Sequence, residues 1–487
     1  MLARRLALAA GAAGMLTAGG VALSSAAAAH PRGPSASSAA PGSGPGLGPT
    51  QRFHSEPGLR PPVLSLSAGR RGGSADIFLT PMHSPQRGPM IVNSRGQLVW
   101  FLPRRHGVAT NLEVQSYRGQ PVLTWWEAGP GRGRDVIMNR SYRVVKVLHA
   151  GHGYTADSHE FQLTAHGTAY LNAVAPVRTD LTGVGGPRQG MADDDIIQEL
   201  DVRTGRVLWE WHSLSHVPVT DSYYRQSFQQ PYDYFHLNSI QQLPGGNLLI
   251  SARNTWAVYE INQRTGRIMW TLGGRHSDFA IRTGAEFEWQ HDARLSGHLL
   301  SLFDDAALPQ EEPQSSGKLL RLNLRSRTVR LVRRYTHSPP LVSGQEGNMQ
   351  LLPGGDVFVG WGAQPDFSQY APGGRQILNG SFAEGVMSYR AYRFAWMGQP
   401  LTRPAMAAAR STKGVRVWAS WNGATDVSSW RVLGGSSPTQ LKRLKTTPAA
   451  GFETTIALVA RPRYLAVQAL SSGGSVLSTS RVMAGPA

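Results

Sequence analysis

The sequence contains no cysteine, which excludes disulfide bonds, thiolate metal ligands, a cysteine nucleophile and a lipoprotein anchor. Acidic residues are also few: 31 Asp and Glu face 49 Lys and Arg, and the formal net charge is +18. A surface this basic attracts anions. Because the start of the chain indicates export, we expect no nucleic acid partner, and an anionic polymer of the cell envelope stays open as a partner.

The N-terminal residues have the order of a secretory signal peptide. Arg4 and Arg5 precede a long Ala/Leu/Gly/Val stretch that ends in four alanines at 26–29. We predict a signal peptide over residues 1–29 and export by the Sec or twin-arginine route, with the protein secreted or held at the envelope; a membrane anchor is the alternative. Residues 30–62 are dense in Pro, Gly, Ser and Ala, which predicts a disordered leader.

Helical periodicity is almost absent between residues 63 and 400. Short apolar runs separated by Gly, Asn, Asp and Pro take its place, and this pattern predicts an all-β fold. LDVRTGRVLWEW and INQRTGRIMWTL align without gaps, and each reads as strand, tight turn and strand. A second kind of hairpin alternates with the first, for example HLNSIQQLPGGNLLISAR at 236–253.

Two hairpins per repeat make a four-stranded unit. The turn glycines of the second hairpin are spaced by 48, 79, 51 and 57 residues and stand at Gly119, Gly167, Gly246, Gly297 and Gly354. This is the blade period of a β-propeller, with an insertion at 180–195. Strands around Ile77–Leu79 and Tyr389–Trp396 would supply one further blade. We therefore predict a six-bladed β-propeller over residues 63–400.

The pattern changes after Trp396 to alternating strands with tryptophans at 418, 421 and 430. It predicts a small fibronectin-type β-sandwich over residues 405–487 as a second domain. Residues 401–487 hold eleven Lys and Arg against two acidic residues, a net charge of +9. This segment is therefore the part expected to dock on an anionic polymer.

Three of the fifteen histidines share one position in the repeat. His159, His236 and His291 each begin the first strand of a blade hairpin, a few residues before its turn glycine. Equivalent positions on successive blades converge on one end of a propeller channel, so we expect the three imidazoles to face one another. Arg253 ends the strand after the one that His236 begins, and its guanidinium fork suits a tetrahedral or planar oxyanion.

Several longer motifs, in this order over about residues 70–400, resemble the bacterial arylsulfotransferase family. They are DSHEF, DYFHLNSI, SARN, EWQHDARL, EGNMQLLPGGDVFVGWG and SYRAYRF. The trailing fibronectin-like segment resembles the actinobacterial branch of that family. The resemblance implies a six-bladed propeller that moves a sulfuryl group from a phenolic sulfate ester to a phenolic acceptor by a ping-pong route, without a nucleotide donor or other cofactor.

The resemblance also implies roles for individual residues. His291, in EWQHDARL, matches the nucleophile that is transiently sulfurylated, while His159, His236 and Arg253 match the residues that hold the sulfuryl and phenolic oxygens. A phenolic acceptor would need an apolar rim around the site. Six aromatic residues near the histidines or in the equivalent strands could form it, although each is also a candidate for packing between blades. They are Trp125, Trp126, Tyr234, Phe235, Trp289 and Trp361.

Other functions stay open from the sequence. The main alternative is a propeller without catalysis that binds a sulfated or aromatic ligand of the envelope or the extracellular space. The RTGRVLW runs also resemble the repeats of quinoprotein dehydrogenases, whose calcium site needs an acidic cluster, and here the densest one is Asp193–Asp195 in the insertion. Zinc on the three histidines is a further alternative, disfavoured because Arg253 would repel a dication. We expect no bound metal.

Overall fold

The computed structural model describes residues 47–68, 75–129, 133–225 and 231–486, so the predicted signal peptide lies outside it. The described residues form β-strands together with three short 3-10 helices, η1 (Thr182–Val184), η2 (Ser213–Ser215) and η3 (Val219–Asp221). The all-β prediction is confirmed. No helix in these ranges has the length and apolarity needed to cross a membrane.

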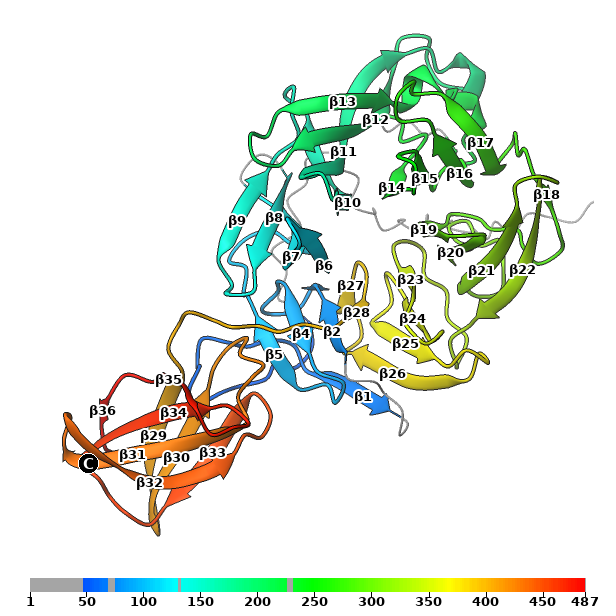
Figure 1. Cartoon of the computed structure of the whole chain (residues 1–487). Coiled ribbons are helices and arrows are strands. Elements are labelled where there is room, and N and C mark those ends of the chain that lie inside the picture. The colour runs from blue at the N-terminus through cyan, green and yellow to red at the C-terminus, as the bar shows by residue number, and fades with distance from the viewer. Residues whose placement is uncertain (1–46, 69–74, 130–132, 226–230, 487) are drawn as a thin grey trace, which may run out of the picture. The chain divides into compact units, whose positions relative to one another are not determined.

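Six sheets of four or five strands, almost wholly antiparallel, occupy the described residues between 64 and 394 (Figure 1). The first three, in order of pairing, are β28 (Tyr392–Phe394), β2 (Asp76–Leu79), β4 (Met90–Val92) and β5 (Leu98–Phe101); β6 (Ala109–Tyr117), β7 (Gln120–Ala128), β8 (Gly133–Asn139) and β9 (Val144–Leu148); and β10 (Thr155–Leu163), β11 (Thr168–Thr179), β12 (Gly190–Asp201) and β13 (Val207–His212).

The next three sheets complete this region. They are β14 (Leu237–Gln242), β15 (Leu248–Ala252), β16 (Ala257–Ile261) and β17 (Ile268–Gly273); β19 (His291–Ser296), β20 (Leu299–Asp304), β21 (Ser316–Asn323), β22 (Thr328–Tyr335) and β18 (Ala280–Ile281); and β23 (Asn348–Leu351), β24 (Val357–Gly360), β25 (Asp366–Tyr370), β26 (Gln376–Phe382) and β1 (Leu64–Ala68). A two-stranded pair, β3 (Pro81–Met82) with β27 (Met387–Ser388), lies beside them in sequence.

One sheet joins the two ends of this region of the chain. β28 pairs antiparallel with β2, with Phe78 opposite Tyr392. Neighbouring sheets contact through their first strands, from β6 to β10, β14, β19 and β23 in turn. β24 then contacts β28, and both β28 and β2 contact β6. The order of contacts thus returns to its starting strand.

Apolar clusters lie between successive sheets. Leu248 and Ile250 of β15 pack in a cluster with Ile197 of β12, in the preceding sheet. Leu249 of β15 packs with Leu300 of β20, in the following sheet. Because alternate side chains of a strand point to opposite faces, both faces of β15 are buried, and this explains why its sequence LLISA is apolar almost throughout.

The hairpin turns follow the sequence signals. The Gly246 N–H donates to the Leu243 carbonyl at 2.9 Å, and Gly246 has a φ of +94° that favours glycine. In the RTG turns the Gly205 N–H bonds to the Asp201 carbonyl at 2.8 Å. These contacts set the register of hairpins β14–β15 and β12–β13.

Residues 47–62 make specific contacts, although composition assigned them to the leader. The Gln51 N–H donates to the Pro61 carbonyl at 2.8 Å, and the Ser55 N–H donates to Glu453 Oε2 at 2.6 Å. The His54 ring stacks on Trp418 at 4.0 Å between centroids. The partners are distant in sequence, so composition alone could not reveal them, and the ordered chain begins before Val63.

The C-terminal residues form two further sheets. One contains β29 (Ala405–Ser411), β30 (Gly414–Ser420) and β33 (Glu453–Leu458); the other contains β32 (Gln440–Pro448), β31 (Ser429–Ser437), β34 (Tyr464–Leu470) and β35 (Val476–Thr479), with β36 (Met483–Ala484) on β34. Val417, Trp430 and Val467 share one apolar cluster with other residues of both sheets. This segment therefore has a core of its own.

Removing residues 405–487 should leave a soluble protein that melts cooperatively, because each segment has its own core. The melting temperature should fall by several degrees, because the Asn422 side chain bonds both the N–H and the carbonyl of Phe101 at 3.0 and 2.9 Å, and these bonds would be lost. Differential scanning calorimetry measures the change. Loss of the whole fold would contradict the boundary at Pro404.

Candidate active site

The three histidines singled out in the sequence lie together. The ring centroids of His159 and His236 are 4.8 Å apart. The ring centroid of His291 lies 6.4 Å from that of His159 and 6.3 Å from that of His236. They come from β10, from the residue before β14, and from the start of β19. The structure thus brings the three imidazoles to one place, as their shared position in the repeat predicts.

An irregularity of the first strand recurs at this place. The register shifts in β10, β14 and β19 next to the three histidines, and β6 has a similar shift at Thr110. Non-glycine residues adopt positive φ there, with 60° at His236, 53° at Asp292 and 63° at Asn111. A β-bulge redirects a side chain out of the strand's alternation, and such strain is commonly kept at functional sites.

Each imidazole is held by a carboxylate at Nδ1. His236 Nδ1 lies 2.6 Å from Asp233 Oδ2, and His291 Nδ1 lies 2.7 Å from Asp305 Oδ2. His159 Nδ1 pairs with Asp157 in the same way. An ionised carboxylate accepts a hydrogen bond from the Nδ1–H, so the neutral form of each ring carries its proton on Nδ1 and leaves Nε2 as the free nitrogen.

The environment of His291 keeps its imidazole neutral. Burial lowers the pKa of His291 well below 6.5, and the positive charge of Arg253, then of the neighbouring histidines, lowers it further. Burial would raise the pKa of Asp233, but its pairing with His236 holds that pKa below the usual range. The site therefore combines one neutral, buried imidazole with an ionised carboxylate partner for another.

Arg253 lies directly across the hairpin from His236. Its backbone N–H donates to the His236 carbonyl at 3.0 Å, which explains why one histidine and one arginine seventeen residues later share a site. The guanidinium stacks over Trp289 at 4.7 Å and donates from Nη2 to the carbonyls of Ala307 and Gly344 at 3.3 and 3.0 Å. Nη1 bonds Asn254 Oδ1, while Nε has no partner among the described residues.

An acidic residue of the insertion supports His236. Asp195 accepts bonds from the backbone N–H groups of His236 and Leu237, both at 3.1 Å. The run Asp193–Asp195 lies in strand β12, whereas the sequence placed it in an insertion and offered it as the densest acidic cluster for a calcium site. Asp195 anchors the start of β14, whereas Asp194 accepts bonds from Ser213 Oγ and the Leu214 N–H and lies 2.7 Å from His212 Nδ1.

Two groups that were not predicted from the sequence lie in or beside the site: Tyr389 contacts His159, and Glu346 lies close to Asp305, whose pKa is raised by burial and further by the charge of Glu346. The Tyr389 ring is 5.5 Å from His159, and its buried hydroxyl has no partner among the described residues. Glu346 is buried with both carboxylate oxygens unpartnered, and burial raises its pKa to about 8. Gly347, the residue after Glu346, donates its backbone N–H to the Tyr389 carbonyl at 3.0 Å, so the two segments are hydrogen-bonded to each other. Both lie inside the motifs EGNMQ and SYRAYRF, which offered a signal.

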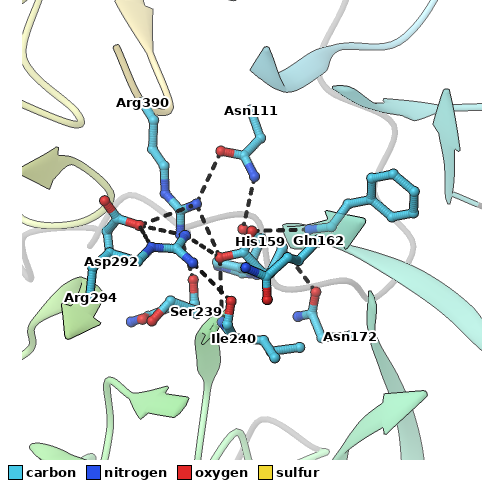
Figure 2. A network of polar contacts seen from close by, with 12 residues as sticks. Asn111, His159, Gln162, Asn172, Ser239, Ile240, Asp292, Arg294 and Arg390 are labelled. Atoms are coloured by element: carbon cyan, nitrogen blue, oxygen red, sulfur yellow. Dashed lines mark hydrogen bonds and ion pairs between the residues drawn. The ribbon is translucent and has the colours of Figure 1, made fainter. Parts of the chain in front are cut away.

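A buried ionic network adjoins the site (Figure 2). Arg390 donates to Asn111 Oδ1 at 3.1 Å and to the Asn238 carbonyl at 2.6 Å, and lies 3.4 Å from Glu160. It also lies 3.6 Å from Asp292. Glu160 and Asp292 follow His159 and His291 directly in sequence, so the network fixes the backbone on which these histidines stand.

The expected aromatic rim is mostly core. Trp289 contacts a predicted site residue, because the guanidinium of Arg253 lies over its ring, and its Nε1 donates to the Pro309 carbonyl at 3.1 Å. Trp126 is half-buried and bonds the Ala156 carbonyl. The remaining four pack in the clusters between sheets and are Trp125, Tyr234, Phe235 and Trp361. The apolar periodicity of the sequence could not distinguish aromatic residues that line the site from those that pack between sheets.

Among the residues that the structure describes, two groups of side chains could hold a cation. One ligand atom from each of His159, His236 and His291 lies within 4.8 Å of the other two. The second group is Glu288, Asp304 and Glu312. That group already binds an ammonium, because Lys318 Nζ pairs with Asp304 and lies 2.8 Å from Glu312.

The described sheets and this histidine cluster define an all-β protein with a buried polar site, and the sequence comparisons name its family. The arylsulfotransferase (ASST) family profile matches residues 113–383, more than half of the chain. The chain belongs to this family, which supports arylsulfotransferase activity in general. A search of curated proteins found no significant match.

Solved structures resemble the chain only distantly. A protein of unknown function from Bacteroides caccae has 13% identity over 66% of this chain and 99% of its own, with a TM-score of 0.42. Virginiamycin B lyase from Staphylococcus aureus has 11% identity over 74% and 97%, with a TM-score of 0.34. The Dos1 propeller has 11% identity over 77% and 80%, with a TM-score of 0.32.

Because burial and Arg253 lower the pKa of His291, its ring should stay neutral as the pH falls through 6.5. The nitrogen chemical shifts of the His291 imidazole measure this, with the signal assigned by its loss in His291→Asn. The unfolded chain takes up a proton at about 6.5 and the folded chain does not, so this residue's contribution to stability should fall below that pH. Titration of His291 at or above 6.5 would contradict the account.

Proposed function

We propose that the protein transfers a sulfuryl group from an aryl sulfate ester to a phenolic acceptor through a covalent intermediate on His291. One observation carries the proposal: three imidazoles with Nδ1 held by carboxylates lie together, and one of them is neutral and buried beside Arg253. Family membership supports the reaction class. The route and the residue roles are our inference.

In the first step the Nε2 lone pair of His291 attacks sulfur, a nitrogen–sulfur bond forms, and the bond from sulfur to the aryl oxygen breaks. The bonding electrons leave with the aryl oxygen. The imidazolium form of His159 or His236, which carries a second proton on Nε2, gives that proton to the phenolate and becomes a neutral imidazole. Covalent catalysis of this kind divides one difficult transfer into two easier ones. The acceptor phenol then attacks sulfur, gives its proton to the same histidine, and releases His291.

Asp305 supports the charge that develops on His291. Burial raises the pKa of Asp305 well above its usual range, against the opposing effect of Arg253. A carboxylate of this kind accepts a proton more readily than an exposed one, so it can draw the Nδ1 proton toward itself as Nε2 becomes bonded to sulfur. The sulfurylated ring then carries less positive charge.

Arg253 offers donors to the sulfuryl oxygens. Three of its five N–H groups are bonded to Asn254, Ala307 and Gly344, which leaves the Nε–H and one Nη1–H. A well-placed donor to oxygens that gain negative charge contributes on the order of 3 kcal/mol to such a reaction. The stack on Trp289 keeps the guanidinium plane fixed.

The finer architecture that we propose is a six-bladed propeller followed by a fibronectin-type sandwich. The return of the sheet contacts to β6 supports the first. The strand orders β29-β30-β33 and β32-β31-β34-β35 around one apolar cluster support the second. We also propose export by the N-terminal signal, with aryl sulfates and phenols as small-molecule partners and an anionic envelope polymer as a partner of the basic C-terminal segment.

When the protein is mixed with 4-methylumbelliferyl sulfate and no acceptor, it should release about one equivalent of the phenolic product, 4-methylumbelliferone, in a burst. His291→Asn should abolish the burst because its side chain cannot form the intermediate, while the exposed His298→Asn should keep it. Stopped-flow fluorescence gives the amplitude. A full burst in His291→Asn would refute the role of His291, and its absence in the unchanged protein would favour a propeller that binds such ligands without catalysis.

Arg253→Lys should lower turnover about 100-fold because the ammonium cannot reproduce the planar donors. Arg275→Lys is the matched control, since Arg275 also stacks on an aromatic ring, at 4.4 Å from Tyr223, and bonds the Ser222 carbonyl. Steady-state rates are compared at temperatures well below both melting points. Equal rates in the two variants would remove Arg253 from the site.

A further inference from the structure

We propose that His159, His236 and His291 form a binding site for a divalent transition-metal ion, with Zn²⁺ as the representative case. One ligand atom of each lies within 4.8 Å of the others. Three nitrogens bound to tetrahedral zinc at 2.0–2.1 Å stand roughly 3.4 Å apart. Each ring therefore needs to move inward by less than about 1 Å, a shift that small side-chain rotations supply.

The partners of the second ring nitrogen carry the inference further. Metal-bound histidines usually donate the other ring N–H to a carboxylate, which fixes the tautomer and makes the ligand nitrogen more basic. Asp157, Asp233 and Asp305 do this for all three histidines. In the proposed transfer only His291 uses its Nε2 lone pair to attack sulfur. A metal ion would bind the Nε2 lone pair of all three rings, each with its Nδ1–H held by an aspartate.

The positive charge of Arg253 next to His291 is offset by the carboxylates around the cluster. Arg253 was the reason to expect no zinc, but its Nη2 donates to the Ala307 and Gly344 carbonyls, and an aspartate lies against Nδ1 of each imidazole. The other nearby guanidinium, Arg390, is paired with Glu160 and Asp292. With three imidazoles and no thiolate in the chain, the donor set suits zinc, copper, nickel or iron.

The test is isothermal titration of the EDTA-treated full chain with zinc chloride at neutral pH. We expect one zinc ion per chain, loss of this binding in each of His159→Asn, His236→Asn and His291→Asn, and about 10- to 100-fold weaker binding in Asp233→Asn. His298→Asn, an exposed histidine outside the cluster, should bind as the unchanged protein does. Co²⁺ in the same site should give visible absorption bands typical of tetrahedral coordination.

Absence of stoichiometric binding would overturn the proposal, as would binding that survives in all three cluster variants. Melting curves of the variants identify any loss of fold, and Asp233→Asn provides the graded reading if a histidine variant unfolds. The result is independent of catalysis because no aryl sulfate is present.

Zinc and the aryl sulfate should also exclude each other, a consequence that rests on the proposed function. Zinc on Nε2 of His291 removes the nucleophile, so zinc should suppress the phenol burst and EDTA should restore it. A burst without any zinc binding would contradict the metal site alone. A burst that requires zinc would contradict the covalent histidine route and leave the metal site standing.

Discussion

The rest of the structure depends on the hydrogen bonds and ion pairs of one buried guanidinium, that of Arg390. It stands just before β28 and reaches Asn111 of β6, Glu160 of β10, the backbone of β14 at Asn238, and Asp292 of β19. A charge this deeply buried is tolerated only with ionic and hydrogen-bonded partners. Because those partners come from four other sheets, satisfying Arg390 requires the first strands of all of them to converge.

The same requirement positions the histidines. Glu160 and Asp292 meet Arg390 and Arg294, and each follows a histidine of the cluster, so the ionic network and the imidazoles lie on adjacent residues of bulged strands. Burial then makes His291 neutral, and the carboxylates at Nδ1 set its free nitrogen. Packing, charge satisfaction and reactivity are therefore consequences of one convergence of strands.

The sequence revealed the features that repeat and missed those that do not. The all-β class followed from missing helical periodicity, and the histidines could be grouped because each stands before a turn glycine at the same point of a hairpin. Asp305 meets His291 across the hairpin β19–β20, Asp195 reaches His236 from another sheet, and Ser55 meets Glu453 from the far end of the chain. The hairpin contact depends on a strand register that is irregular at His291, and the other two contacts join residues that only tertiary packing brings together, so no local pattern encodes them.

Transfer through His291 requires that sulfur becomes bonded to its imidazole ring. Rapid quenching in alkali after mixing with an aryl sulfate, followed by proteolysis and mass spectrometry, locates the group directly. We expect one added sulfuryl group on the peptide that contains His291, and its loss when a phenolic acceptor is supplied. A label on His159 or His236, or a turnover-competent protein that never carries a label, would contradict transfer through His291.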